Sequence, residues 1–472
     1  MAQPPAEAGA WYCPAAADPQ EPAAVSVAAV GDRPSTVTVV HYGPDGATVD
    51  PAVAVAPGQP VEVALPAGQA AQPVVLRWRG GPTVATWRAE GGQRTGAPCA
   101  AAPSATWHLA GFDTRLGAVS KLHLFNPFAE DAVATVTFGT PQGRQTLVRT
   151  QNIVVPAGRM TTLALNELQP EVSDLGANVQ VLAGRVVAQG EVRFDPPDDE
   201  PGLTGRTLLP AAPAPSLEWS FGFARADDNS SSWLEVLNPG DDEAAVRLQV
   251  SDPHDGGAAL AEEVSVPAGG MVRVDLAEAS AQPDFGVAVT SVNDVPVVVS
   301  RFTAVRGDGG SAVAAALGAD RAATRWALVG GGTARRSARV SLYNPSPQPA
   351  SVDVLAAGAP PTWTGVQLPP NARTVIDLAE AGADRPTVPV LVQASVPVVA
   401  ELRSLSEHGG LGLWTAVGVA ADDWSGPPLR PPVRRDPSLP ARPLPVDTSE
   451  PVDAVAAPQA TAPATSEVPP GG

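Results

Sequence analysis

The chain has 472 residues, of which 30 are basic and 49 are acidic, so its net charge at pH 7 is −19. This excess of negative charge opposes binding to nucleic acid and to anionic lipid surfaces. No apolar stretch reaches the roughly 18 residues that cross a bilayer, so we expect membrane attachment only through an anchor that is absent from this chain.

The first predicted unit covers residues 11–103 and opens with Trp11. An alternating β-run follows at 36–40, a Pro-Gly turn at 56–59, and a further apolar run that leads to Arg88. Proline presets φ and glycine supplies positive φ, so the Pro-Gly segment predicts a turn between two strands.

Cys13 and Cys99 are the two cysteines of the chain, and they stand at the two ends of this first unit. The first and last strands of a sandwich can lie side by side, so we expect a disulfide with Cα atoms within about 7 Å. Disulfides persist outside the cytoplasm, which predicts an extracytoplasmic protein. The alternatives are two unrelated thiols in a cytoplasmic protein, or a metal or catalytic cysteine without any supporting CxxC motif.

The second unit, residues 104–213, begins near Trp107 and carries Asn126-Pro127 about 19 residues later. Period-two alternation, β-branched residues and glycine or proline punctuation predict seven strands. We expect them at 107–112, 121–125, 132–139, 152–155, 160–165, 177–182 and 185–194, with one helical turn near 166–168.

The same anchors recur twice more. The third unit, 214–322, has Trp219 and Asn238-Pro239, and the fourth, 323–424, has Trp326 and Asn344-Pro345. Self-similarity at about 110 residues predicts one domain in tandem copies.

The repeated residues have structural interpretations. We expect the tryptophans to bury their rings in equivalent core positions. An asparagine before proline is held in extended backbone and can hydrogen-bond the following turn. Each unit closes with an apolar run into an arginine, and we expect these side chains to pair with an acid or to line a sheet: Arg193, Arg301 and Arg403.

Seven short strands in about 100 residues are typical of an immunoglobulin-like sandwich, in which two sheets each bury one alternating face. A β-propeller is the main alternative, but its blades repeat at about 40 to 50 residues. We therefore predict an all-β fold, a tandem array of four immunoglobulin-like β-sandwich domains. Residues 425–472 contain 13 Pro and no aromatic residue, which predicts a disordered Pro/Ala-rich tail.

Several motifs occur in a fixed order: the opening Trp11-Tyr12-Cys13-Pro14, the run 124–133, and Val-Pro-Ala-Gly turns before strands that end in Asp-Leu. In these motifs the chain resembles an actinobacterial family of secreted or envelope-associated proteins of unknown function. The resemblance implies export, a membrane anchor before the Trp-Tyr-Cys motif, and no assigned activity. Lys121 is the single lysine, and with abundant Ala, Gly and Pro it indicates a GC-rich bacterial genome.

The sequence lacks the motifs of a nucleophile elbow, a phosphate-binding loop, a dinucleotide site and an H-E-x-x-H zinc site. His108 and His123 could meet on neighbouring strands, but a third ligand is missing. The loops 195–200, 227–230 and 251–255 are rich in oxygen and could hold Ca²⁺, although the first and third do not recur in the other copies. We therefore predict no catalytic residues, no metal, no cofactor and no enzymatic activity. The remaining histidines are scattered: His41, His254 and His408.

Two functions remain. The first is a scaffold or interaction protein of the bacterial cell envelope, whose partner is an envelope protein or a glycan. The alternative is an array of carbohydrate-binding modules, in which exposed tryptophans stack on sugar rings. The candidates for this stacking are Trp78, Trp87, Trp363 and Trp414. They do not fall at matching repeat positions, which favours the scaffold.

Overall fold

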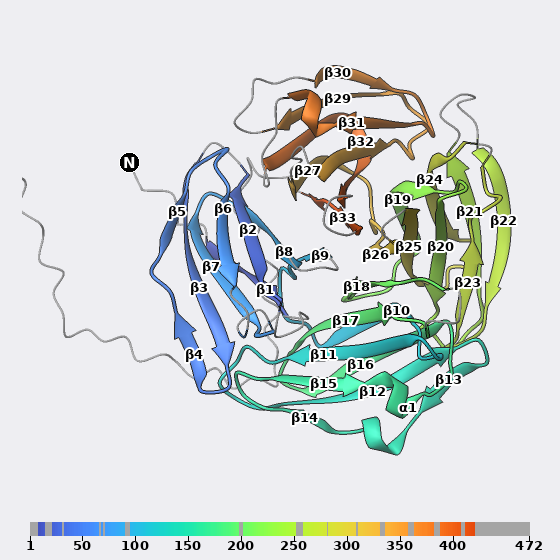
Figure 1. Ribbon diagram of the computed structural model, residues 1–472. Coiled ribbons are helices and arrows are strands. Elements are labelled where there is room, and N and C mark those ends of the chain that lie inside the picture. The colour runs from blue at the N-terminus through green and yellow to red at the C-terminus, as the bar shows by residue number, and fades with distance from the viewer. Residues whose placement is uncertain are drawn as a thin grey trace, which may run out of the picture. The chain divides into compact units, whose positions relative to one another are not determined.

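The computed structural model describes residues 8–14, 21–30, 33–65, 68, 71–89, 95–197, 202–251, 258–280, 282–307, 310–330, 336–356, 363–381, 388–406 and 411–420. The tail predicted at 425–472 lies outside these residues. The described strands form two antiparallel sheets in each of the first three sandwiches and one eight-stranded sheet, folded into two layers, in the fourth; Figure 1 shows the four sandwiches in colours that run from blue to orange. The predicted all-β fold of tandem immunoglobulin-like sandwiches is confirmed.

The first sandwich contains β1 (Ala8–Cys13), β2 (Ala23–Ala29), β3 (Ser35–Gly43), β4 (Gly46–Val49), β5 (Val53–Val55), β6 (Val61–Leu65), β7 (Val74–Gly80), β8 (Thr83–Ala89) and β9 (Gly96–Pro98). The second contains β10 (Thr106–Phe112), β11 (Ala118–Phe125), β12 (Ala132–Thr140), β13 (Gly143–Thr146), η1 (Val148–Thr150), β14 (Ile153–Val155), β15 (Met160–Ala164), α1 (Leu165–Leu168), β16 (Leu175–Ala183), β17 (Val187–Phe194) and β18 (Gly205–Pro210). Their sheets have the orders β1-β7-β3-β4 and β6-β2-β8-β9, then β10-β16-β12-β13 and β15-β11-β17-β18.

The third sandwich contains β19 (Glu218–Arg225), β20 (Ser230–Leu237), β21 (Ala244–Ser251), β22 (Ala258–Val266), β23 (Met271–Asp275), β24 (Asp284–Ser291), β25 (Val298–Gly307) and β26 (Gly310–Leu317). The fourth contains β27 (Ala323–Gly330), β28 (Arg336–Tyr343), β29 (Ala350–Ala356), β30 (Trp363–Leu368), β31 (Arg373–Asp377), η2 (Leu378–Ala381), β32 (Val388–Ser406), β33 (Gly412–Val417) and β34 (Val419–Ala420). The third keeps the same pattern, β19-β24-β21-β22 and β23-β20-β25-β26. In the fourth, the 19-residue β32 pairs in both layers.

Near its end, each sandwich has a strand at the edge of its second layer that the sequence did not predict: β9, β18, β26 and β33. All four start at glycine, and β26 is mostly alanine. Glycine and alanine have low β-propensity, so β9 and β26 form because they pair with the preceding strand and not because of their composition. The composition of β33, with Leu, Trp, Thr and Val, does suit a strand.

The repeated tryptophans occupy equivalent core positions, as predicted. Trp107, Trp219 and Trp326 are each 2–3% exposed. The indole Nε1 donates to the carbonyl oxygen of Val186, Val297 and Val398 at 2.8, 2.8 and 2.7 Å. In the first sandwich the Nε1 of Trp11 donates to the carbonyl oxygen of Thr83 at 3.1 Å, so the weaker first copy keeps this contact.

The repeated asparagines build the same turn three times. Asn126, Asn238 and Asn344 are fully buried. Each Oδ1 accepts from the backbone N–H two residues ahead, at 3.0, 2.9 and 3.0 Å. Each Nδ2 donates to the carbonyl four residues ahead and to the end of a strand. One asparagine side chain thus satisfies three or four backbone polar atoms, which explains why the Asn-Pro pair recurs.

Cys13 and Cys99 form a disulfide, with Cα atoms 4.6 Å apart. Both side chains are buried in the core of the first sandwich. The bond joins the end of β1 to the segment after β9, so the first and last strands meet as the sequence predicted.

The outer face of the second sheet in each sandwich is covered and not solvated. Directly equivalent positions on β2, β11, β20 and β28 carry polar residues that are at most 4% exposed: Ser26, His123, Glu235 and Ser341. All four sandwiches lie in one compact unit, and at Glu235 and Ser341 the cover includes the preceding sandwich.

Candidate functional site

The most polar contact between sandwiches centres on Glu401 of β32. Its Oε2 accepts from Nη1 of Arg301 at 2.9 Å and from the backbone N–H of Phe223 at 3.0 Å. Its Oε1 accepts from Nη2 of Arg301 at 2.7 Å and from the hydroxyl of Thr415. Both charged side chains are fully buried. This bidentate geometry satisfies the carboxylate and links the third sandwich to the fourth.

Two further arginines lie beside this pair. The guanidinium carbons of Arg373 and Arg403 lie 5.6 and 4.2 Å from the ring centroid of Phe223. Burial lowers the pKa of each guanidinium to about 10. The Nε of Arg373 donates to the carbonyl oxygen of Gly222 at 2.7 Å, so this charge too is used to hold β19 against β28 and β31.

Between the second and third sandwiches the central polar residue is Glu235. Its Oε1 accepts from Nε1 of Trp233 at 2.9 Å, and its Oε2 is buried without a hydrogen-bond partner. The ring of Trp233 stacks on Phe302 with centroids 5.2 Å apart. Burial first, and then the negative charge of Asp174, raise the pKa of Glu235 well above its ordinary value.

Between the first and second sandwiches the corresponding cluster surrounds Glu191. Arg206 lies 3.6 Å from its Oε1, and His123 lies 3.4 Å from its Oε2. Arg206 also reaches Glu21 of the first sandwich at 3.4 Å. Burial alone would raise the pKa of Glu191, but the hydrogen bond and charge of His123 together with Arg206 and Lys121 lower it.

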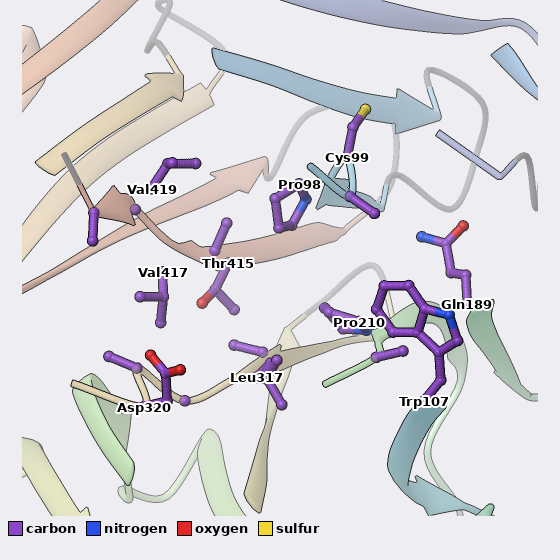
Figure 2. Close-up of a pocket in the computed structure, with 18 of the residues that line it drawn as sticks. Pro98, Cys99, Trp107, Gln189, Pro210, Leu317, Asp320, Thr415, Val417 and Val419 are labelled. Atoms are coloured by element: carbon purple, nitrogen blue, oxygen red, sulfur yellow. The ribbon is translucent and has the colours of Figure 1, made fainter. Parts of the chain in front are cut away.

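A cavity of about 520 Å³ is lined by residues of all four sandwiches (Figure 2). The labelled lining residues are Pro98, Cys99, Trp107, Gln189, Pro210, Leu317, Asp320, Thr415, Val417 and Val419. A second cavity, of about 530 Å³, lies within the third sandwich. The first cavity thus lies between sandwiches, and the second lies within one.

The polar groups on the wall of the 520 Å³ cavity are few. The hydroxyl of Thr415 is already bound to Arg301 and Glu401. The Oε1 of Gln189 is buried and has no partner, so it can accept a hydrogen bond. Asp320 is exposed to solvent. Among the described lining residues, no nucleophile and base lie within hydrogen-bond reach of each other.

Two of the three arginines that close the predicted repeats pair with an acid as expected, Arg193 with Asp195 and Arg301 with Glu401, but the three do not occupy equivalent positions. Arg301 pairs with Leu234, which lies four residues before the repeated asparagine. In the second and fourth sandwiches the residues in the place of Arg301 are Gly190 and Leu402, so neither is an arginine. Arg193 is exposed and bound to Asp195 at 2.9 Å, whereas Arg301 is fully buried. An apolar run followed by an arginine does not fix how the strand pairs with its neighbour, because the arginine can follow the run at different distances in different copies.

The histidine pair singled out from the sequence does not meet. His108 lies on β10 and binds Asn178 at 2.7 Å, whereas His123 lies on β11 in the other sheet and binds Thr162 at 2.9 Å. His41 is bound to Asp50. His254 and His408 lie outside the described residues.

Two of the three oxygen-rich loops extend beyond the described residues, at 198–200 and 252–255. In the remaining loop, 227–230, Asp227 is held by Nε of Arg225 at 2.6 Å and by the N–H of Asn229 at 2.9 Å. In the part of the chain that the structure describes, no group of three or more His, Cys, Asp and Glu side chains could hold a metal ion. Across those same residues, no helix has the length and apolar character to cross a membrane.

The tryptophans proposed to stack on sugars are not exposed platforms. Trp87 and Trp414 are 2% and 5% exposed. Trp78 and Trp363 are half-buried and pack against the cores of the first and fourth sandwiches. Their irregular spacing reflects structural roles that differ between copies.

A protein-family model matches part of the chain, residues 82–316. That segment matches the model of a family of unknown function (DUF5719). The match runs from the turn before β8 into β26, and so covers the end of the first sandwich, all of the second and nearly all of the third. No curated protein matches the chain.

Two solved structures show limited similarity. The crystal structure of Thermotoga maritima 1070 is 18% identical, with a TM-score of 0.21, and the alignment covers 22% of this chain and 94% of that one. Salmonella alpha-2-macroglobulin reacted with methylamine is 9% identical, with a TM-score of 0.15, and the alignment covers 88% of this chain and 40% of that protein.

Proposed function

We propose that this protein is a non-enzymatic scaffold or interaction protein that works outside the cytoplasm, in the cell envelope of an actinobacterium. The observation that carries the proposal is the use made of its buried charged side chains. Arg301, Glu401 and Arg206 bind across contacts between sandwiches and do not face a common cavity. Charges used in this way fix the arrangement of binding surfaces and leave few groups for acid–base chemistry.

The disulfide supports an extracytoplasmic location. Cys13 and Cys99 are both buried and bonded. Reducing systems of the cytoplasm keep thiols free, so a structural disulfide is typical of proteins that fold outside it. The motif resemblance to envelope-associated proteins points in the same direction.

The composition of the 520 Å³ cavity supports a binding role over a catalytic one. Its wall is largely Pro, Ala, Val and main chain, and Gln189 supplies an unpartnered acceptor. Such a wall suits a polypeptide or another ligand that donates a hydrogen bond. The carbohydrate-module alternative loses its supporting observation, because Trp87 and Trp414 are buried.

The location is tested by the redox state of the cysteines in living cells. Cells of the source organism that express the protein from its own gene are quenched in acid and treated with a maleimide that adds mass to free thiols. We expect Cys13 and Cys99 to stay unlabelled unless a reductant is added first. Labelling of both without reductant would place the protein in the cytoplasm.

The interaction role is tested by chemical crosslinking in intact cells followed by mass spectrometry. We expect crosslinks from residues of the sandwiches to one or a few envelope components, at sites that repeat between experiments. A purified protein that turns over a substrate, with loss of turnover in Gln189→Ala, would overturn the scaffold proposal in favour of an enzyme.

A further inference from the structure

A small cavity lies at the contact between the third and fourth sandwiches, apart from the cavity that all four sandwiches line. Its volume is about 10 Å³, which is room for one water-sized ligand. The fourth sandwich contributes three arginines to its wall: Arg339, Arg373 and Arg403. Across the contact, the third sandwich contributes Phe223 and Asp284. The wall therefore carries three positive charges and one negative charge.

Arg403 is a buried cation without a counter-charge. It is 5% exposed, and its guanidinium carbon lies 4.2 Å from the centroid of the Phe223 ring. In the part of the chain that the structure describes, this guanidinium has no hydrogen bond and no ion pair. The face of an aromatic ring attracts a cation, but by less than the charge loses when it leaves water. Arg403 therefore lacks the partner that a buried charge requires.

Arg373 has the same deficit at one of its nitrogens. It is 8% exposed, and its Nε donates to the carbonyl oxygen of Gly222 at 2.7 Å and to Oγ of Ser341 at 2.8 Å. Its Nη2 is buried and has no hydrogen-bond partner. An unpaired N–H of a buried guanidinium costs free energy, so Nη2 indicates a missing acceptor. Burial lowers the pKa of Arg373 and Arg403 to about 10, as expected where no neighbouring anion offsets the charge in full.

Most carboxylates of this contact are bound by other arginines. Both oxygens of Glu401 accept from Arg301, and Asp377 lies 3.2 Å from Nε of Arg339. Among the described residues of the contact, five arginines face four carboxylates: Arg225, Arg301, Arg339, Arg373 and Arg403 against Asp227, Asp284, Asp377 and Glu401. One positive charge is therefore left over.

Asp284 does not neutralise the two arginines directly. Its Oδ2 lies 3.9 Å from Nη1 of Arg225, and its Oδ1 is buried without a hydrogen-bond partner. Within the described residues, no ion pair joins Asp284 to Arg373 or Arg403. A water molecule in the cavity would bridge these groups, but it would leave the extra positive charge uncompensated because it is neutral.

The three arginines are particular to the fourth sandwich. Strand pairing identifies the residues that take the places of Arg339, Arg403 and Arg373 in the third sandwich as Trp233, Phe302 and Met271. The rings of Trp233 and Phe302 stack there with centroids 5.2 Å apart. Aromatic and thioether side chains thus fill the same places in a neighbouring copy, so the sandwich fold itself does not require arginines here.

We propose that this cavity binds a single halide ion, chloride in the natural setting, between the guanidinium groups of Arg373 and Arg403. The ion accepts from Nη2 of Arg373 and lies against the guanidinium of Arg403. Asp284 limits the affinity, because like charges repel. A cavity of this size has no room for sulfate or phosphate. The bound ion offsets the extra positive charge and so helps to hold the third sandwich against the fourth.

The test follows the melting temperature of the full chain as sodium chloride replaces sodium gluconate at constant ionic strength. A ligand that binds only the folded state raises the melting temperature as its concentration passes its dissociation constant. We expect a rise with chloride and also with bromide. A melting temperature that responds to neither ion would overturn the proposal.

Two variants separate the site from a general effect of salt. Arg403→Phe installs the residue that the third sandwich carries at this place, and its melting temperature should not respond to the exchange of chloride for gluconate. Arg247→Met is the matched control, because Arg247 is exposed, binds Glu263 at 2.6 Å and does not line the cavity. It should keep the full response. A response in Arg403→Phe as large as in the natural protein would mean that chloride acts elsewhere, and the proposal would be wrong.

A third variant gives a gain of binding and does not depend on the loss of an arginine. Asp284→Asn keeps the shape of the side chain and removes the like charge from the wall. The chloride concentration at which the melting temperature begins to rise should fall at least about threefold. An unchanged or higher concentration would contradict a site beside Asp284.

Crystals grown in sodium bromide give the position of the ion. We expect an anomalous peak at the bromine absorption edge within contact distance of Nη2 of Arg373. Electron density in the cavity without an anomalous signal would identify a water molecule there and overturn the proposal.

Discussion

Arg301 and Glu401 form a bidentate ion pair that has no solvent exposure and joins the third sandwich to the fourth. The pair is enclosed by the backbone N–H of Phe223 and the hydroxyl of Thr415. A pair of this kind is weak evidence for stability, because desolvation opposes the attraction, but loss of one partner leaves a buried charge uncompensated.

The first prediction concerns this pair. Glu401→Leu should lower the free energy of unfolding by about 3–5 kcal/mol, because Arg301 stays buried without a counter-charge. The double variant Arg301→Met with Glu401→Leu should recover most of that loss. Calorimetric melting of the single and double variants gives the comparison.

Arg339→Met is the control for the first prediction. Its pair with Asp377, at 3.2 Å, is partly exposed, so solvent screening limits the effect to about 1 kcal/mol or less. If the double variant is as unstable as Glu401→Leu alone, the loss does not come from the uncompensated charge of Arg301, and the prediction is wrong.

The second prediction concerns the disulfide between Cys13 and Cys99. The bond closes a loop with a sequence separation of 86 residues, and the chain-entropy estimate for its removal is about 4–5 kcal/mol. Cys99→Ser should therefore destabilise the first sandwich far more than the others. Hydrogen exchange measured by mass spectrometry should show faster exchange in β1 to β9, and uniform acceleration over all sandwiches would contradict a local role.

The third prediction concerns pH and Glu235. Because the folded-state pKa of this carboxyl is raised above its ordinary value of 4.5, the folded protein holds the proton more tightly than the unfolded chain does. The stabilisation is complete below pH 4.5 and is lost as the pH rises toward the folded-state pKa. Glu235→Gln keeps the shape of the side chain but cannot ionise. This variant should therefore melt at a higher temperature than the natural protein at neutral pH.

The measurement for Glu235 is the melting temperature of both proteins from pH 4 to pH 9. The difference in favour of Glu235→Gln should grow as the pH rises above 4.5. The charges that face Glu235 are Asp113 and Asp174 from the second sandwich and Arg273 from β23, and their ordinary titration is common to both proteins. A difference that does not change with pH would mean that Glu235 is already ionised in the folded state.

The fourth prediction concerns the repeated asparagines. Asn238→Asp keeps the shape but replaces the Nδ2 donor with an oxygen that faces the carbonyl oxygens of Asp242, Val266 and Pro267. The loss should be about 2–4 kcal/mol. Asn126→Asp and Asn344→Asp should cost similar amounts by thermal melting, whereas a large difference between copies would show that the turns are not equivalent.

The fold could be predicted because its anchors are local. A Trp followed by an Asn-Pro pair, with period-two alternation between turns, identifies one domain and its copies. Two strands near the ends of sandwiches, β9 and β26, were missed because alanine and glycine carry no strand signal of their own, as in β26. Only pairing with β25 makes that segment a strand.

The polar contacts between sandwiches could not be predicted for a different reason. Alternation along a strand separates the core face from the outer face, and it assigns the outer face to solvent. Glu235 and Ser341 follow that pattern, yet each is covered by the preceding sandwich, at Gly111 and at the backbone of Gly222. What covers an outer face depends on how domains dock, and no local pattern encodes it.

The covered outer faces also set a limit on recombination between the copies. The shared position carries a carboxyl in Glu235 and a hydroxyl in Ser341, and each meets a different part of the preceding sandwich: Gly111 of the second and the backbone of Gly222 of the third. An exchange between repeats would place the wrong side chain against each neighbour. We therefore expect selection to keep both the number and the order of the sandwiches. A gain or loss of one sandwich should be selected against even where the sandwich itself would fold.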